Sequence, residues 1–245
     1  MPYRRLPNTD RARMRAMKTA LKNQEEEVEL IIPYDFRMKL QEVSQKFEGR
    51  LNFKNSTQQK GLLLNKKHKE FTNKARMYIS HFIQVVNMAI QRGELGENVR
   101  SYYGIDIKNT KLPDLSSDNL LLEWGEKIIN GENDRMNKGG NRIYNPSLAL
   151  VSINYEKFKD SYKELKYQQE TQLRANEELV KYRDTADKHI VKLWDILEKH
   201  FDFSNEDKSR TACSAWGINY VYRKNELEKI EKKRYADSIS LSFNF

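Results

Sequence analysis

The sequence has few of the residues that cross-link a chain or interrupt its helices. Its 245 residues include ten glycines, five prolines and one cysteine, Cys213. A single cysteine cannot form a disulfide within the chain, which fits the reducing environment of the cytoplasm. We expect Cys213 to be a small buried side chain rather than a nucleophile. The scarcity of proline and glycine leaves room for long, uninterrupted helices.

The sequence also lacks long apolar runs. Its apolar runs are short, such as "LIIP" at 30–33, "LLL" at 62–64 and "NLLLEW" at 119–124, whereas a membrane-spanning helix needs about 20 apolar residues. The basic start of the chain is not followed by the apolar segment of a secretory signal peptide. These features predict a cytoplasmic protein with no membrane partner.

Motifs of the common enzyme classes are missing. The sequence contains no P-loop, dinucleotide fingerprint, nucleophile elbow or Cys-x-x-Cys, and no Glu-x-x-His of the kind that binds metals in helical bundles. The glycines of "NKGGNR", 137–142, have basic neighbours that suit a phosphate, but no strand precedes them and a turn is the simpler interpretation. The four histidines are scattered, at 68, 81, 189 and 200. We therefore predict no enzyme, no catalytic residue, no metal and no cofactor.

What the sequence has in abundance is charge, and this charge is unevenly placed. Charged residues make up 32% of the chain and hydrophobic residues 38%, a balance typical of helical proteins with wide solvated faces. Of the net charge of +9, residues 1–22 supply seven basic residues against one acidic residue. Residues 223–234 supply six basic against three acidic residues. A basic arm on a nearly neutral body favours an anionic partner.

Helical patterns cover most of the chain. A capping residue at 8–10 starts an N-terminal helix, and Pro33 and Pro146 each precede a long helical pattern, 113 residues apart. A cluster of Gly, Asn, Ser and Thr at 48–61 indicates the bend of a helical hairpin. Residues 119–137 form a shorter amphipathic pattern.

Two corners of the chain resemble each other. "SYYGI" contains Gly104 and "SAWGI" contains Gly217, again 113 residues apart, while Ala75 and Ala186 are 111 apart in matching helices. These spacings predict an internal duplication. The expected fold is mainly α: a four-helix bundle made of two duplicated helical hairpins, with a small β-sheet near the C-terminus.

The sheet is expected from extended segments at 28–32, 218–223 and 238–245. The last of these alternates apolar and polar residues over "SISLSFNF". The predicted organisation therefore has five parts. These are a basic N-terminal arm and helix (1–27), a first hairpin repeat (28–110), a connecting helix and Gly-Gly turn (111–145), a second hairpin repeat (146–223), and a basic linker with a C-terminal strand (224–245).

Four segments together resemble a family of helical proteins of the Bacteroidota. They are "MPYRRLPNTD" at the start, "EWGEKIINGE" at 123–132, "GGNRIYNP" at 139–146 and "YVYRKNE" at 220–226. The resemblance runs over nearly the whole chain and implies a cytoplasmic helical protein. The family brings no established activity or functional residues, so the resemblance implies no site.

Two functions from different classes are consistent with these patterns. The first is a structural, assembly or protein-binding protein that self-associates, in which the terminal strand adds to the sheet of a neighbour. Pairing of this strand with 218–223 of the same chain is the alternative. The candidate residues for self-association are Ile239, Leu241, Phe243 and Phe245.

The second function is an adaptor that binds nucleic acid or a ribonucleoprotein through the basic arm. An array of basic residues neutralises several phosphates with little sequence readout. The alternative is that these side chains cover the end of the bundle or pair with the acidic residues at 25–29. The candidate residues are Arg4, Arg5, Arg11, Arg13, Arg15, Lys18 and Lys22.

Overall fold

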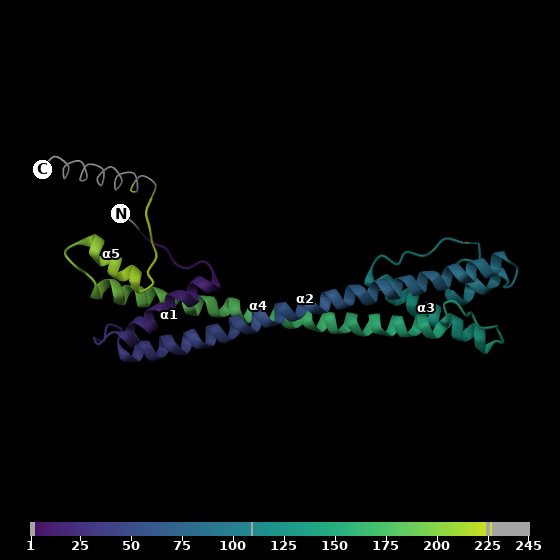
Figure 1. The fold of residues 1–245 in the computed structure, drawn as a ribbon, viewed down its shortest axis with the longest axis horizontal. Helices are drawn as coiled ribbons and strands as arrows, with labels where there is room; N and C mark the ends of the chain where they lie inside the picture. The colour runs from purple at the N-terminus through teal and green to yellow at the C-terminus, as the bar shows by residue number, and fades with distance from the viewer. Residues whose placement is uncertain (1–2, 109, 224–225, 227–245) are drawn as a thin grey trace, which may run out of the picture. The chain divides into compact units, whose positions relative to one another are not determined.

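The computed structural model describes residues 3–108, 110–223 and 226 of the chain, and these are mainly helical (Figure 1). The predicted mainly α class is therefore confirmed. The α-helices are α1 (Asp10–Glu26), α2 (Tyr34–Gln91), α3 (Asp118–Asn137), α4 (Leu148–His200) and α5 (Glu206–Ala215), with one 3₁₀ helix, η1 (Glu97–Tyr103). Two short strands, β1 (Tyr3–Arg4) and β2 (Tyr220–Val221), complete the elements. No described helix is both long and apolar enough to cross a membrane.

The two long helices are continuous, so the predicted bend at 48–61 is wrong. Helix α2 runs for 58 residues and α4 for 53, and neither 28–110 nor 146–223 forms a helical hairpin. Glycine in a helix costs about 1 kcal/mol relative to alanine, but contacts with α4 offset this cost. The Nε2 of Gln168 donates to the carbonyl of Thr57 at 2.8 Å, and a Cβ on Gly61 would lie 3.3 Å from Gln172.

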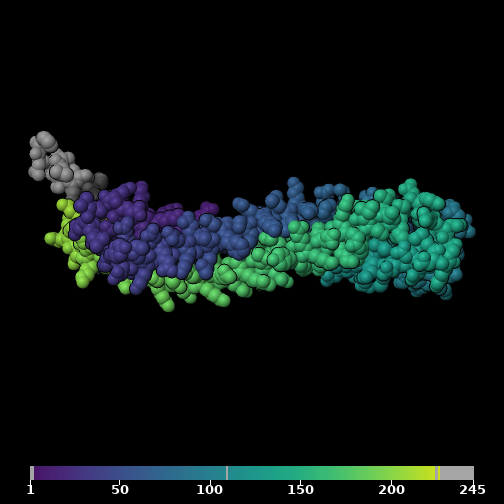
Figure 2. Space-filling view, turned by 90° about the horizontal axis from the view of Figure 1, so that it is seen from below, coloured from purple at the N-terminus to yellow at the C-terminus, as the bar shows by residue number. Residues whose placement is uncertain are grey.

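The chain forms two compact units. The first unit contains residues 1–55 and 174–245, and the second contains 56–173. Each unit contains part of each long helix. The first unit is assembled from segments far apart in the sequence, whereas the second is contiguous. In the space-filling view, purple N-terminal residues and green to yellow C-terminal residues together form the surface of the first unit (Figure 2). The predicted four-helix bundle of two hairpins is not confirmed.

The core of the first unit lies between α1, α2, α4 and α5. Thr9 caps α1 by accepting a hydrogen bond from the backbone of Ala12, as the sequence predicts for positions 8–10. One face of α1 is fully buried at Met17 and Ala20. These side chains pack in the same core as Phe47 of α2 and Trp194 of α4. The predicted buried cysteine, Cys213 of α5, lies in this core and is confirmed.

The core of the second unit depends on the close approach of α3 to its neighbours. Helix α3 coincides with the predicted helix at 119–137, and Ile128 is fully buried with Phe82 and Phe158. Alanine at Gly125 would place its Cβ inside the ring of Tyr155. The same change at Gly131 would collide with the backbone carbonyl of Tyr102 in η1. The glycines of "EWGEKIINGE" are therefore required by packing.

The two predicted corners share one local geometry. Gly104 and Gly217 both have positive φ, at 66° and 98°, a region that favours glycine. The isoleucine that follows each glycine donates to the carbonyl five residues earlier: Ile105 to Arg100 and Ile218 to Cys213. The aromatic residue before each glycine is buried in its own unit. The repeated sequence thus encodes a repeated turn.

The small sheet is present near the C-terminus, but its partner strand was not predicted. Strand β1 pairs antiparallel with β2, with Tyr3 opposite Val221 and Arg4 opposite Tyr220. The prediction of extended structure at 218–223 is therefore confirmed in part. The predicted strand at 28–32 is wrong, since this segment is a connection between α1 and α2. The predicted strand at 238–245, with Ile239, Leu241, Phe243 and Phe245, lies outside the described residues.

Candidate functional site

The basic residues at the start of the chain divide into two groups, and the first group binds carboxylates of the same unit. The Nη1 of Arg4 lies 2.6 Å from Asp195 and 3.1 Å from Glu198, both on α4. Arg13 donates through Nε and Nη2 to the two oxygens of Asp187, each at 2.8 Å. These side chains anchor β1 and α1 to α4. The expected alternative partners were the acidic residues at 25–29, whereas Arg4 and Arg13 pair with carboxylates of α4.

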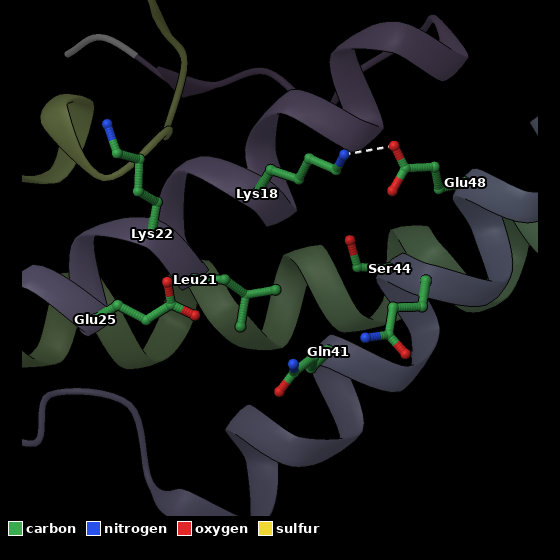
Figure 3. A pocket seen from close by; sticks show the side chains of 8 residues that line it. Lys18, Leu21, Lys22, Glu25, Gln41, Ser44 and Glu48 are labelled. Atoms are coloured by element: carbon green, nitrogen blue, oxygen red, sulfur yellow. Dashed lines mark hydrogen bonds and ion pairs between the residues drawn. The ribbon is translucent and has the colours of Figure 1, made fainter.

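Lys18 and Lys22 also have carboxylate partners. Lys18 bonds to Glu48 of α2 at 2.5 Å, and Figure 3 shows the two side chains facing each other between α1 and α2. Lys22 lies 3.5 Å from Glu26 within α1. Both lysines line a pocket of about 330 Å³ that also contains Glu25. Because this α1–α2 pocket holds charges of both signs, it has no preference for an anion.

The second group consists of Arg5, Arg11 and Arg15. All three are exposed, and no hydrogen bond or ion pair joins their side chains to another described residue. Two members of this group, Arg5 and Arg15, line one pocket of about 380 Å³ in the first unit. We call it the α1–α5 pocket. Of the predicted binding residues, these two are the ones that the structure brings together in a cavity without a carboxylate.

The α1–α5 pocket is built from the start and the end of the described chain. Its walls come from the segment before α1, from α1 itself, from α4 and from the corner after α5. Besides the two arginines, its polar lining comprises Thr19, Trp194, Ser214 and Asn219. The backbone amide of Arg5 donates to the carbonyl of Asn219 at 2.8 Å. None of these four polar residues was predicted from the sequence. Trp194, Ser214 and Asn219 lie about 200 residues from the arm, and Thr19 is on α1.

The most buried donor of this pocket has no partner. Trp194 is fully buried, and its indole Nε1 makes no hydrogen bond to any described residue. Buried N–H groups are nearly always paired, because an unpaired donor loses its hydration without compensation. The pocket thus combines two unpaired cations with an unsatisfied donor in its wall.

An ion network fixes the start of α1. Asp10 accepts two hydrogen bonds from Arg183, at 2.7 and 2.8 Å, and lies 3.8 Å from the Nζ of Lys54. The hydrogen bonds from Arg183 hold the pKa of the Asp10 carboxyl below its usual value, although partial burial opposes this shift. Asp10 is also in the first turn of α1, where the helix dipole favours an anion.

A buried ion pair stabilises the second unit. Glu132 and Arg135 of α3 are 1% and 4% exposed and are joined by two hydrogen bonds of 2.8 and 2.7 Å. The Tyr103 hydroxyl donates to Glu132 at 2.6 Å. Burial raises the pKa of the Tyr103 phenol, and the Glu132 carboxylate raises it further. Arg135 also donates to the carbonyl of Asn141. The amides of Gly139 and Gly140 donate to the carbonyls of Met136 and Arg135 at 2.9 and 3.0 Å, so the Gly-Gly segment is the turn that the sequence favours.

One histidine lies in a polar cluster that resembles a catalytic triad in composition. His68 Nδ1 is 2.9 Å from Ser161 Oγ, and His68 Nε2 is 3.1 Å from Asp118 Oδ2. Ser161 donates its hydroxyl proton to the carbonyl of Phe158 at 2.7 Å, so its Oγ is an acceptor for His68 rather than an activated nucleophile. The ring of His68 stacks on Phe158 in the core. This cluster joins three helices and is structural.

Two further features concern the cysteine and possible metal ligands among the residues that the structure describes. Burial raises the pKa of the Cys213 thiol, which keeps it protonated and unreactive. Within the part of the chain that the structure describes, no three His, Cys, Asp or Glu side chains are grouped so that they could hold a metal ion.

Comparisons with known proteins give no relative. The sequence matches no protein family model, and neither a curated protein nor a solved structure shows significant similarity to it. The resemblance to a Bacteroidota family therefore stays a prediction, and the function of the chain is argued from its own residues.

Proposed function

We propose that the chain is a non-enzymatic binding or assembly protein of the cytoplasm that self-associates through an apolar surface of its first unit. The observation that carries the proposal is a group of exposed apolar side chains at the entry to α2. Val28 is fully exposed, while Leu30, Tyr34 and Met38 are 58%, 62% and 48% exposed. We call these four residues the apolar cluster. Exposed apolar side chains that gather in one region are typical of protein-binding surfaces.

The segment that carries the cluster is held in place. Gln24 is 3% exposed, and its side chain donates to the carbonyl of Glu29 at 2.8 Å and accepts from the amide of Ile32 at 2.6 Å. Ile32 is fully buried next to the exposed residues. The apolar cluster is thus a fixed feature of the surface, and Tyr34 and Met38 lie one turn apart on the same face of α2.

Light scattering coupled to gel filtration tests this proposal. We expect the protein to be an oligomer whose mass falls in the double variant Tyr34→Ser with Met38→Ser. The matched control is the double variant Leu62→Ser with Leu63→Ser. It removes two apolar side chains elsewhere on α2 that are 65% and 71% exposed. We expect the oligomer of this control to have the same mass as that of the wild type. A monomeric protein at all concentrations would contradict self-association. A loss of mass in the control alone would contradict the role of the apolar cluster.

The terminal strand remains a second candidate for the contact. Deletion of 238–245, with Ile239, Leu241, Phe243 and Phe245, is expected to lower the mass if this strand adds to a neighbouring sheet. Unchanged mass after the deletion would remove the strand from the proposal. The two variants together separate the terminal strand from the apolar cluster.

The alternative function, an adaptor for nucleic acid or a ribonucleoprotein, is favoured by the three unpaired arginines. If Arg5, Arg11 and Arg15 alone contact phosphates, the affinity for duplex DNA should fall with a logarithmic salt slope of about −3. Use of all seven basic residues would give a slope of about −6. Replacement of the three arginines by serine should abolish the binding, as measured by fluorescence anisotropy, and survival of binding would contradict this alternative.

We also propose that the fold arose by internal duplication, with boundaries that differ from those expected from the sequence. Each repeat would comprise a short helix, a proline, a long helix and a Gly-Ile corner. In support, Ser117 caps α3 through the amide of Leu120, as Thr9 caps α1 through Ala12. The duplication requires the corners at 103–105 and 216–218 to follow the same backbone path in a crystal structure of the protein. Different paths would contradict it.

A further inference from the structure

The lining of the α1–α5 pocket includes two basic residues and no acidic one. Arg5 and Arg15 line it, whereas the adjacent Arg4 and Arg13 each bind a carboxylate of α4. None of the residues that line the pocket is acidic. Like charges gathered in one cavity repel each other, and an anion between them would relieve this repulsion.

The other polar groups of the pocket suit an oxyanion. The hydroxyls of Thr19 and Ser214 and the amide of Asn219 are side chains that can donate hydrogen bonds. Trp194 supplies an indole N–H that has no described partner. Oxygen atoms of a phosphate or carboxylate accept several hydrogen bonds at once, so one group could meet several of these donors.

The pocket also has an apolar part and a fixed frame. Pro7, Ala12 and Ala16 contribute to its wall, and its volume of about 380 Å³ exceeds what a bare ion needs. The corner residue Gly217 has φ of 98°, and a Cβ there would lie 3.3 Å from the carbonyl of Ala16. This close approach fixes the corner against α1. The cavity is thus formed before any ligand arrives.

We propose that the α1–α5 pocket binds a small organic anion, whose phosphate or carboxylate group lies between Arg5 and Arg15 and whose apolar part lies against Pro7, Ala12 and Ala16. Phosphate and carboxylate share the same oxyanion chemistry here. The site goes beyond the proposed self-association, because it uses neither the apolar cluster nor the terminal strand.

The indole N–H signals in a nitrogen–proton NMR spectrum provide the test. The chain has three tryptophans, and Trp194→Phe identifies the signal of the pocket. Phenyl phosphate and benzoate are titrated into the full-length protein to about 10 mM at constant ionic strength, which nearly saturates a site with a Kd of about 1 mM. Benzyl alcohol is the uncharged control. We expect a saturable shift of the Trp194 signal with at least one of the two anions and none with benzyl alcohol.

Single arginine variants distinguish the pocket from general surface charge, and Arg15 and Arg11 form a matched pair because both are on α1. Arg5→Ser and Arg15→Ser should each weaken binding about tenfold or more, as expected for a lost charge-assisted contact. Arg11→Ser removes the same charge from the same helix outside the pocket and should leave the affinity unchanged. Circular dichroism checks that each variant folds.

Each outcome has a distinct meaning. A shift with phenyl phosphate alone identifies a phosphate ester site, and a shift with benzoate alone identifies a carboxylate site. No saturable shift with either anion would overturn the proposal. Equal losses in Arg11→Ser and Arg15→Ser would also overturn it, because binding would then depend on surface charge rather than on the pocket.

Discussion

The guanidinium of Arg13 forms a two-pronged ion pair with the carboxylate of Asp187, with both hydrogen bonds at 2.8 Å. The two residues are 174 positions apart in the sequence. Only 11% of the Arg13 side chain and 28% of the Asp187 side chain is exposed. The pair therefore joins α1 to α4 in a partly desolvated setting, where such bonds contribute more than they do at the surface.

Loss of this ion pair should destabilise the first unit. We expect Arg13→Ser to lower the free energy of unfolding by about 1–3 kcal/mol, because Asp187 loses its two hydrogen bonds. Denaturation by urea, followed by circular dichroism, measures the change. Arg11→Ser on the exposed side of α1 is the control, with an expected effect within about 0.5 kcal/mol. Equal effects of the two variants would show that Arg13 is not an anchor.

Stability should depend on the ionisation of Asp10. Its pKa is lowered in the folded protein, chiefly by hydrogen bonds from Arg183. The contribution of Asp10 is therefore complete above the pKa of the unfolded chain and is lost as the pH falls through the lower, folded pKa. We expect Asp10→Asn to be less stable than the wild type at neutral pH, and we expect this difference to narrow as the pH falls through the folded pKa of Asp10. Urea midpoints across this range that stay parallel would contradict the assignment.

Two glycine to alanine substitutions should have opposite effects. At Gly131, a Cβ would collide with the backbone carbonyl of Tyr102, which cannot rotate away, so we expect a loss of about 1–3 kcal/mol. At Gly49 on α2, a Cβ would meet nothing within 4 Å, and alanine should add up to about 1 kcal/mol through its helix propensity. Thermal melting compares them. Stabilisation by both variants would mean that α3 and η1 are not in close contact.

The buried carboxylate of α3 should be essential to the second unit. Glu132→Gln keeps the shape of the side chain but leaves Arg135 buried without a counter-charge, which we expect to cost about 3 kcal/mol. Glu123→Gln on the same helix is the control, since Glu123 forms an exposed pair with Lys127 and should contribute less than about 1 kcal/mol. Chemical denaturation of both variants measures the two free energies of unfolding. Equal stabilities would contradict a structural role for the buried pair.

Local sequence signals predicted the helices and the corners well, because these features depend on nearby residues. The cap at Thr9, the helix at 119–137 and the glycines of the two corners all follow from short-range geometry. The bend at 48–61 was wrong for the opposite reason. Its residues have weak helix propensity, and the contacts that keep them helical come from Gln168 and Gln172, more than 100 positions away.

The candidate site was predicted only in part. Composition identified the basic arm, and Arg5 and Arg15 belong to it. Composition could not separate these two from Arg4 and Arg13, whose carboxylate partners lie on the distant helix α4. The donors Trp194, Ser214 and Asn219 carry no sequence signal of their own, since only the fold brings them beside the arm.

The order in which the two units are completed during synthesis follows from their composition. The second unit, 56–173, is contiguous and can fold as soon as it leaves the ribosome. The core of the first unit also contains residues of α4 and α5, so α1 and the start of α2 lack part of their packing until about 190 further residues are made. At typical elongation rates this wait lasts roughly 10–40 s.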